Sequence, residues 1–545
     1  MEAMSCVVCS GPTSLRCSGC RSVFYCSRGH QKQHWSEHKR ECKQSYALSQ
    51  SERLGRHLVA ARDLEAGELL LREVALVVGP KAASSCVCLG CHQELTPPAH
   101  SCPGCGWPLC SADCRASPHH ASECSLLEKA GIGASALLHA ALSAQVAAYS
   151  FVTPLRCLLV KRASTRSWDT LNSLQSHVEE RLSTPAYVAY RQNVAKFIGD
   201  VLGLYGDGFD ENAILKMCGI LDTNSFEVKW VPKKYPSARL AKVRALFPLT
   251  SMIAHDCRPN TRHTFEQEDD GAVPWGRLVM SVYTSVPVRK GEVLTATYTQ
   301  SLWPTKRRRA HLKMAKCFSC ECQRCCDPTE LGTNFGAIRC FGATKEGCEG
   351  LLVPLNPLEE TSKWKCTVCR KEIPSTSMDS LNSKLHDEIL ERASKVNQKL
   401  AENGRMKNIP KTDPEILEEF LVKYRKELHP LNHHAIQVKY ALNQIYGKIP
   451  GHPLKTLSNE KIKRKEELCH QLLEAANILE PGLTRLRADL LIDLHETAQE
   501  ISRRNISSTR KSKKSSKVEE EDAEKLLKDA LKVLATEKQG GSIPV

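Results

Sequence analysis

Residues 6–42 read CVVCSGPTSLRCSGCRSVFYCSRGHQKQHWSEHKREC. Eight of these residues have the spacing of metal ligands: Cys6, Cys9, Cys17, Cys20, Cys26, His30, His38 and Cys42. Zn²⁺ binds four thiolate or imidazole ligands tetrahedrally, and a two-residue gap lets one turn supply two of them. A disulfide framework is the alternative, but we expect no signal peptide ahead of the stretch, and 545 residues far exceed a disulfide-stapled miniprotein. The stretch predicts a binuclear zinc module.

The same order of cysteine and histidine residues recurs further along the chain, with shorter gaps. The eight positions are Cys88, Cys91, Cys102, Cys105, Cys110, Cys114, His120 and Cys124. Cys86 and His119 lie beside two of these positions and compete with them as ligands. The repeated spacing predicts a second zinc finger at this point of the chain.

The segment between the two clusters has the pattern of β-structure. Residues 54–78 read LGRHLVAARDLEAGELLLREVALVV, in which apolar residues alternate or run on either side of the turn at 65–67. Such a pattern, punctuated by glycine, predicts two short strands that form a β-hairpin.

Three later segments resemble the signature motifs of SET-domain methyltransferases. Residues 246–261, LFPLTSMIAHDCRPNT, resemble the NHSCxPN motif, and residues 291–298, GEVLTATY, resemble GEELTxxY. Residues 317–325, CFSCECQRC, resemble the post-SET CxCxxC, and the stretch at 6–42 closely resembles the MYND zinc finger. In this order, and with the helical tail described below, the segments resemble the SMYD family (SET and MYND domain proteins). The resemblance is strongest to the arthropod branch, which carries a second finger inside a split SET domain.

The resemblance implies an α+β multidomain fold. It comprises a split SET β-domain with MYND-type zinc fingers, a post-SET zinc site and an all-α, TPR-like C-terminal domain. The expected parts are a MYND finger at 1–45, the first part of the SET domain at 50–85, a second MYND-like finger at 86–125, a helical insert at 126–215, the second part of the SET domain at 216–305, a post-SET segment at 306–330, a ribbon-like segment at 335–372 and a helical domain at 375–545.

The resemblance also implies how the ligands divide among the zinc ions. The sets in the first finger would be Cys6, Cys9, Cys26 and His30 on one ion, and Cys17, Cys20, His38 and Cys42 on the other. The same rule applied to the second finger gives Cys88, Cys91, Cys110 and Cys114, then Cys102, Cys105, His120 and Cys124. A post-SET ion would take Cys257, Cys320, Cys322 and Cys325. The family usually has cysteine where His30 stands, and His34 is interpreted as a packing residue because eight ligands already fill two tetrahedra.

A methyl-transfer site follows from the same resemblance. S-adenosylmethionine would be held by Gly55, Arg56, Asn224, Ser251, His255 and Phe318, and Tyr298 would be the catalytic residue. Glycine lets the backbone approach a ligand closely, and the flat ring of Phe318 can stack on adenine. The Tyr298 hydroxyl can orient an amine, and positioning of this kind contributes up to about 7–11 kcal/mol in favourable cases.

Three positions depart from the family pattern. Ala254 stands where the family has the asparagine of NHSC, whose side chain holds the amino-acid end of the cofactor. His57 replaces the second glycine of the first turn, and Lys316 stands where an aromatic residue often lines the lysine channel. The loss of one buried polar anchor costs about 1–3 kcal/mol of binding, so we expect weaker cofactor binding.

The last third of the chain combines a further cysteine cluster with helices. Cys340, Cys348, Cys366 and Cys369 flank the strand-like residues 351–354 and indicate a single-zinc ribbon; two unrelated thiol pairs in a loop are the alternative. Apolar residues recur near every 3.6 positions at 415–424, 435–446, 468–479, 485–498 and 524–534, which predicts helices. No strict 34-residue repeat is visible. The run at 306–309, KRRR, is interpreted as a charged helix start.

Charge and composition restrict the setting. The chain carries 76 Lys and Arg against 61 Asp and Glu, a net charge of +15, which suits acidic partners. Residues 503–517 are rich in Ser, Arg and Lys, and are either a solvated loop or a nuclear-import signal. The 27 cysteines fall mostly at ligand spacing, which indicates a reducing compartment. We therefore expect the protein in the nucleus and the cytoplasm. The chain contains no run of about 18 apolar residues, so we expect no membrane span.

The sequence as a whole predicts a protein-lysine methyltransferase that uses S-adenosylmethionine and about six zinc ions. Its expected partners are proteins that offer a lysine, histones among them, and proline-rich peptides or corepressors bound by the MYND fingers; we expect a monomer. The rival interpretation is a non-enzymatic adaptor whose cofactor site has decayed, which Ala254 and Lys316 favour. A nucleic-acid-binding zinc protein ranks last, because no finger has a C₂H₂ layout with a base-reading helix.

Overall fold

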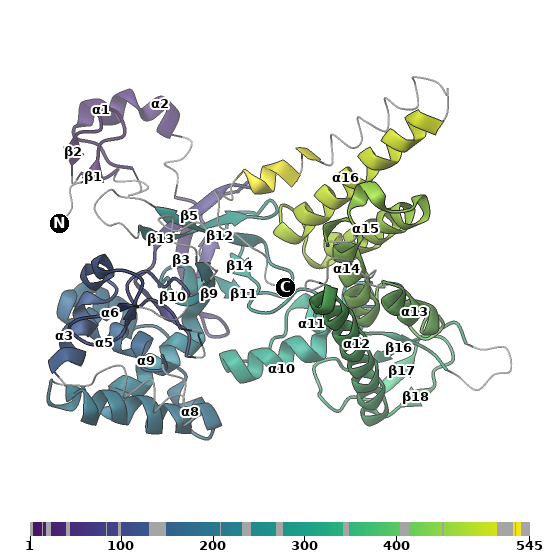
Figure 1. The fold of residues 1–545 in the computed structure, drawn as a ribbon, viewed down its shortest axis with the longest axis horizontal. Coiled ribbons are helices and arrows are strands. Elements are labelled where there is room, and N and C mark those ends of the chain that lie inside the picture. The colour runs from purple at the N-terminus through teal and green to yellow at the C-terminus, as the bar shows by residue number, and fades with distance from the viewer. Residues whose placement is uncertain are drawn as a thin grey trace.

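The computed structural model describes residues 4–13, 15–17, 23–39, 44–82, 84, 86–95, 100–129, 149–207, 209–230, 241–268, 276–341, 348–403, 414–449, 452–508, 527–528 and 530–535. In Figure 1 the short β-sheets lie between a group of helices formed by the middle of the chain and the C-terminal helices. Within these ranges, no helix is long and apolar enough to cross a membrane.

Several small sheets form the centre, and three of the four described here combine distant parts of the chain. One sheet has the order β6 (Val77–Pro80), β10 (Ala241–Leu246), β9 (Ser225–Trp230), and another has β12 (Thr261–Glu268), β13 (Arg277–Thr284), β5 (Leu69–Val74). A third pairs β3 (Tyr46–Ser51) with β4 (Gly55–Ala60), and β11 (Ala254–His255) runs parallel to β14 (Thr295–Ala296). The split β-domain therefore closes only when residues before 80 pair with residues after 240.

The predicted hairpin at 54–78 is wrong, although its two strands exist. β4 pairs with β3, whereas β5 pairs with β13, two hundred residues later. The turn between them contacts the same distant strand, because the Gly67 and Glu68 amides donate to the carbonyl and the hydroxyl of Thr284. β4 therefore forms a hairpin with the strand before it, and the tertiary pairing of β5 overrides the local pattern.

The second finger and the helical insert share one apolar core. The finger contains β7 (His100–Ser101), β8 (Pro108–Leu109), a 3₁₀ turn at Ala112–Ala116 and α3 (Ala121–Lys129). The insert follows with α5 (Val152–Ala163), α6 (Thr165–Asn172), α7 (Val178–Arg181), α8 (Pro185–Tyr190), π-helical turns at Arg191–Ala195 and Phe197–Val201, and α9 (Glu211–Asn224). Trp107 of the finger is fully buried against Tyr149 and Phe151. α9 continues across the boundary expected at 215/216.

A buried ion pair fastens α5 to that finger. Arg156 donates to both carboxylate oxygens of Glu123, at 2.6 and 2.7 Å, and to the carbonyls of Val78 and Leu89. Burial alone would raise the pKa of Glu123, but Arg156 holds it below its usual range. The carboxylate in turn contacts Nδ1 of His120 at 3.1 Å. One side chain therefore joins the sheet, the finger and the insert.

The first finger is small, with β1 (Met4–Ser5), β2 (Pro12–Thr13), α1 (Arg28–Gln33) and α2 (Trp35–His38). After the sheets come α10 (Thr305–Lys316) and α11 (Gln323–Cys326), which confirm that the run at 306–309 begins a helix. The ribbon is a four-stranded antiparallel sheet of β15 (Ile338–Arg339), β16 (Leu351–Pro354), β17 (Trp364–Cys366) and β18 (Glu372–Ile373).

The C-terminal region is helical, as the apolar periodicity predicts. Its elements are α12 (Ser375–Asn403), α13 (Glu415–Lys423), α14 (His433–Lys448), α15 (Asn459–Leu479) and α16 (Arg485–Ser508). Successive helices pack on one another around Phe420, Leu442 and Leu468, all fully buried. The strands, fingers and helical tail confirm the predicted α+β multidomain class. Most of the basic segment at 503–517 lies outside the described residues.

We predict that Arg156→Met lowers the free energy of unfolding by about 3–5 kcal/mol, because it leaves the carboxylate of Glu123 buried and unpaired. Urea unfolding followed by circular dichroism measures the change. The matched control is Lys81→Met, which removes a half-exposed cation paired with Glu227 and should cost at most about 1 kcal/mol. Equal losses in the two variants would contradict the role given to Arg156.

Candidate functional site

His255 and Tyr298 are brought together by the parallel pair β11 and β14. The register sets Ala254 opposite Thr295 and His255 opposite Ala296, so Tyr298 lies two residues after the last paired residue. The Tyr298 amide donates to His255 Nδ1 at 3.0 Å, which fixes the imidazole orientation. The Tyr298 hydroxyl donates to the carbonyl of Ile253.

Phe318 completes an aromatic cluster with these two residues. Its ring centroid lies 5.8 Å from that of His255 and 6.5 Å from that of Tyr298, and His255 and Tyr298 lie 5.2 Å apart. Burial raises the pKa of Tyr298 to about 12 and lowers the pKa of His255 to about 4. At neutral pH the cluster is therefore uncharged, and the phenol keeps its proton.

Lys316 enters the cluster from the end of α10. Its ammonium lies 5.9 Å from the Tyr298 ring centroid and donates to the carbonyls of Thr223 and Asp222 at 2.7 and 3.1 Å. Burial lowers the pKa of Lys316 to about 8. The ammonium thus binds the carbonyls at the C-terminal end of α9. It also places a cation beside Tyr298, where the resemblance implies an aromatic ring. No spacing or motif in the sequence predicts these contacts of Lys316 with α9.

The other predicted cofactor residues occupy different positions around this centre. Asn224 ends α9, and its amide nitrogen donates to the carbonyls of Gln175 and Ile220, which leaves its side-chain oxygen to accept from a ligand. Ser251 donates to the carbonyls of Asn224 and Phe247. These bonds anchor Ser251 to the protein backbone.

The first turn is more open than the resemblance implies. Gly55 has a φ of +62°, with no atom within 4 Å of where a Cβ would stand, and Arg56 is exposed and bonded to Ser173. His57 is buried, and its Nδ1 lies 3.0 Å from the Gly55 carbonyl. The His57 ring therefore supports the turn that a second glycine would have left free.

The post-SET thiols converge as expected. Cys257, Cys320, Cys322 and Cys325 place their sulfur atoms within 4.8 Å of one another, although Cys257 is more than sixty residues from the others. Arg308 and Arg324, both fully buried, pair with Glu330, and Arg308 Nη2 lies 3.6 Å from the Cys325 sulfur. Four sulfurs at this distance form the donor set that zinc prefers.

The second finger gathers two complete sets of four ligands. They are Cys88, Cys91, Cys110 and Cys114, and Cys102, Cys105, His120 and Cys124. Cys86 and His119 stay outside both sets, and His119 packs on His92 with ring centroids 5.1 Å apart. Glu123 orients His120 through Nδ1, so that Nε2 faces Cys105 at 3.5 Å. A carboxylate behind a histidine ligand raises its basicity, and the sequence analysis missed it because Glu123 has no spacing signal.

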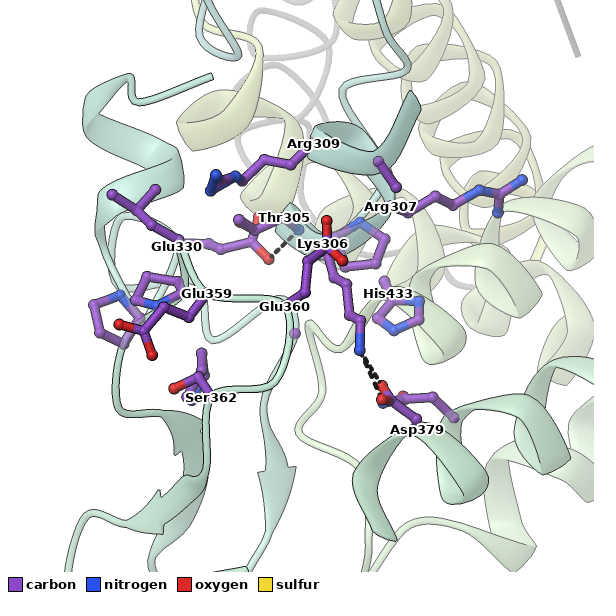
Figure 2. A pocket seen from close by; sticks show the side chains of 18 of the residues that line it. Thr305, Lys306, Arg307, Arg309, Glu330, Glu359, Glu360, Ser362, Asp379 and His433 are labelled. Atoms are coloured by element: carbon purple, nitrogen blue, oxygen red, sulfur yellow. Dashed lines mark hydrogen bonds and ion pairs between the residues drawn. The ribbon is translucent and has the colours of Figure 1, made fainter. Parts of the chain in front are cut away.

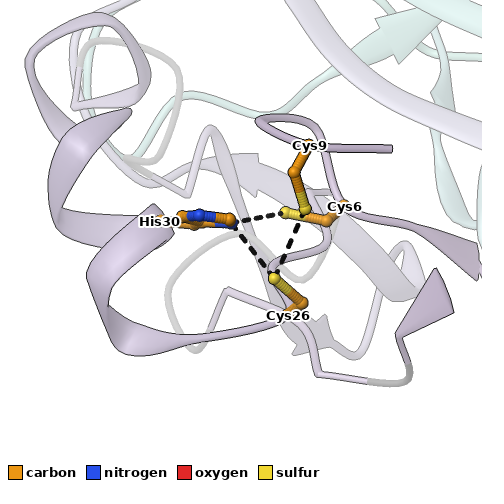
Figure 3. A group of neighbouring side chains, drawn as sticks. All are labelled: Cys6, Cys9, Cys26 and His30. Carbon is orange, nitrogen blue, oxygen red and sulfur yellow. Dashed lines mark hydrogen bonds between the residues drawn. The ribbon is translucent and has the colours of Figure 1, made fainter. Parts of the chain in front are cut away.

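Figure 3 shows the first site of the N-terminal finger. Cys6, Cys9, Cys26 and His30 face one another, with His30 Nδ1 at 3.1 Å from the Cys26 sulfur and 3.5 Å from the Cys6 sulfur. The second set is described only in part: Cys17 and His38 are buried, and Cys20 and Cys42 lie outside the described residues. His34 contacts the Tyr25 hydroxyl at 2.9 Å, which accords with packing.

The ribbon supplies the last set. Cys340, Cys348, Cys366 and Cys369 also lie within 4.8 Å of one another. The first two lie between β15 and β16, and the last two lie at the end of β17 and between β17 and β18. Two unrelated thiol pairs would not converge in this way. The described residues therefore contain five sets of four zinc-type ligands, and the residues of a sixth lie partly outside them.

Comparison with known proteins gives the following similarities. Residues 6–42 match the family model described as MYND finger. Over 343 residues the chain is 32% identical to SET domain-containing protein SmydA-8, isoform A, of Drosophila melanogaster, covering 61% of this chain and 67% of that one. It is 24% identical to Histone-lysine N-methyltransferase ASHR1 of Arabidopsis thaliana, covering 55% of this chain and 59% of that one. It is 22% identical to N-lysine methyltransferase SMYD2 of Mus musculus, covering 50% and 58%.

We predict that elemental analysis finds about six zinc ions per chain, since each set of four ligands fills one tetrahedron. Cys257→Ser should remove about one of them, because it leaves three thiols at the post-SET site. The matched control is Cys157→Ser, which replaces a buried cysteine that belongs to none of the five sets and should keep the full metal content. Two or fewer ions in the natural chain would contradict the assignment of the fingers.

Proposed function

Because this chain belongs to the SMYD family of SET- and MYND-domain proteins, we propose that it transfers a methyl group from S-adenosylmethionine to lysine side chains of other proteins. The observation that carries the proposal is the half-buried cluster of His255, Tyr298 and Phe318 beside the post-SET thiols. The Drosophila relative is described as a SET domain-containing protein, and the mouse relative as an N-lysine methyltransferase.

The side chains around Tyr298 suit the methyl donor in their chemistry. Phe318 offers an aromatic face for adenine, and the free side-chain oxygen of Asn224 can accept from the donor's ammonium group. His255 belongs to the same cluster, and we propose Ser251, Gly55 and Arg56 as further contacts of the donor. When bound, S-adenosylmethionine supplies an electrophilic methyl group on a sulfonium.

The chain's own residues would position the acceptor lysine. Tyr298 keeps its proton at neutral pH, and its hydroxyl is held in a fixed direction by the Ile253 carbonyl. A fixed phenol can align an amine without changing its own charge. Burial in this centre would also lower the pKa of an incoming lysine, as it does for Lys316, and so favour the neutral amine that attacks.

A second candidate function is that of an adaptor with a weakened methyl-donor site, and Lys316 favours it. A resident ammonium at 5.9 Å from the Tyr298 ring opposes a second cation, and both the sulfonium and an acceptor lysine carry positive charge. The MYND fingers would then recruit proline-rich peptides or corepressors, and the nucleus and cytoplasm are the proposed locations. Histones remain one proposed class of lysine-bearing partner.

We predict that Tyr298→Phe abolishes methyl transfer to a lysine-bearing protein and leaves binding of the methyl donor unchanged. The hydroxyl acts on the transition state more than on ground-state binding, so its loss lowers kcat. Transfer of a radiolabelled methyl group measures the rate, and calorimetry measures donor binding. The matched control is Tyr283→Phe, a strand tyrosine outside the cluster. An unchanged rate in Tyr298→Phe would refute the catalytic role.

A further prediction separates the enzyme from the adaptor. Ala254→Asn should tighten binding of S-adenosylmethionine by up to about 1–3 kcal/mol, because it adds a polar anchor for the donor's amino-acid end. Calorimetry on the natural chain and the variant measures the difference. Binding by the variant alone would support the adaptor, whereas equal tight binding by both would support the enzyme and point to another residue as the anchor.

A further inference from the structure

The three lysines of α10 differ in what their ammonium groups bind. Lys306, in the first turn, pairs with Asp379 at 2.6 Å in the wall of a cavity of about 650 Å³, as Figure 2 shows. Lys313, further along the helix, pairs with Glu360 at 3.2 Å. Lys316, the last residue of the helix, donates only to the two main-chain carbonyls at the end of α9. Among the described residues, it is therefore the one lysine of this helix without a carboxylate partner.

The carboxylate that acts on Lys316 is already engaged by other groups. The side chain of Asp222 pairs with Arg244 at 2.9 Å and with Arg181 at 3.7 Å, and it accepts from the Tyr190 hydroxyl at 2.9 Å. Burial lowers the pKa of Lys316 to about 8, so at neutral pH most of these ammonium groups keep their proton. Three cations thus share one carboxylate, and the excess of positive charge favours an anion that enters this region.

Lys316 lies among residues that we propose as contacts of the methyl donor. The two carbonyls that it binds directly precede Asn224, and Lys316 itself stands two residues before Phe318. Its ammonium is 5.9 Å from the centroid of the Tyr298 ring. Tyr298 in turn bonds to the residues on either side of Ala254. The unpaired positive charge is therefore near the position whose asparagine, in the family, holds the amino-acid end of the donor.

The charges of the methyl donor restrict which of its groups an ammonium can bind. S-adenosylmethionine carries one negative group, the carboxylate of its amino-acid end, and two positive groups, the ammonium of that end and the sulfonium. A lysine of the protein attracts the carboxylate and opposes the other two. Among the described residues, Lys316 uses two of its three N–H donors on carbonyls, which leaves the third for a ligand. A charge-assisted hydrogen bond to a carboxylate is stronger than a neutral one.

We propose that Lys316 binds the carboxylate of the methyl donor and so replaces the anchor that Ala254 lacks. The inference rests on the proposed function, because it requires that the site around Tyr298 takes S-adenosylmethionine. One of the two departures from the family pattern removes a polar side chain from the amino-acid end, and the other adds a cation beside the same tyrosine. Lys316 then has two roles: it binds the carbonyls that end α9, and it selects a donor that carries a carboxylate.

Calorimetric titration of the full chain, with zinc bound, tests the proposal with three compounds. S-adenosylmethionine has the carboxylate and the sulfonium, S-adenosylhomocysteine lacks the sulfonium, and decarboxylated S-adenosylmethionine lacks the carboxylate. The natural chain should bind the first two at least about tenfold more tightly than the third, because a hydrogen bond between charged groups is lost with the carboxylate. Lys316→Met should abolish this preference, and Lys316→Arg should keep it. The matched control Lys313→Met removes an exposed ammonium from the same helix and should bind all three compounds like the natural chain.

Zinc content and circular dichroism establish that the variants fold. Equal binding of S-adenosylmethionine and its decarboxylated form by the natural chain would overturn the proposal without any variant, and so would a preference that persists in Lys316→Met. If Lys316→Met binds S-adenosylmethionine more tightly and S-adenosylhomocysteine equally, the ammonium opposes the sulfonium and the proposal is wrong. A natural chain that binds none of the three compounds would refute the methyl-transfer site and this inference together. Lys316-dependent binding without methyl transfer would refute the proposed function alone.

Discussion

The convergence of Cys257 with Cys320, Cys322 and Cys325 is the constraint on which the central site depends. Cys257 follows β11, and the other three follow α10, so a bound metal ion joins the sheet to the end of that helix. Phe318 and Lys316 lie directly before these cysteines and are thereby placed over Tyr298. Four thiols so close together, with no disulfide between them, need a cation that stabilises the thiolate form. Folding and site assembly are thus one process in this protein.

Buried arginines also fix how parts of the chain join, at the post-SET site and in the second finger. Arg308 and Arg324 share the carboxylate of Glu330 behind the post-SET thiols, and Arg156 pairs with Glu123 behind His120. Such pairs contribute little stability when compared with a well-packed apolar core, but each fixes a single arrangement of the elements it joins. Both lie one contact away from a zinc-type ligand, where small displacements would open the donor set. These ion pairs therefore fix the positions of the metal sites relative to the sheets.

The central site differs from the pattern of its family at Ala254 and Lys316, and the two changes alter its polarity and its charge. Ala254 removes a polar anchor, and Lys316 adds an ammonium that is satisfied by the end of α9. An ammonium with a pKa of about 8 is partly neutral near physiological pH, so it opposes other cations less than an exposed lysine would. The two changes therefore alter the polarity and charge around the aromatic cluster and leave its three rings in contact.

The sequence alone determined the zinc-type ligands and the helices, because both depend on the spacing of residues that are close together in the chain. Spacings of two to four residues identify a turn that can supply two ligands, and a 3.6-residue apolar period identifies α13 to α16. The family resemblance added the long-range partnership of Cys257 with the post-SET cysteines. Only the tertiary structure decided how β4 and β5 pair, since β4 pairs with the preceding β3 and β5 pairs with the distant β13. It also decided the contacts of Glu123, Arg156 and Lys316, because a side chain's partner across the fold leaves no trace in the residues beside it.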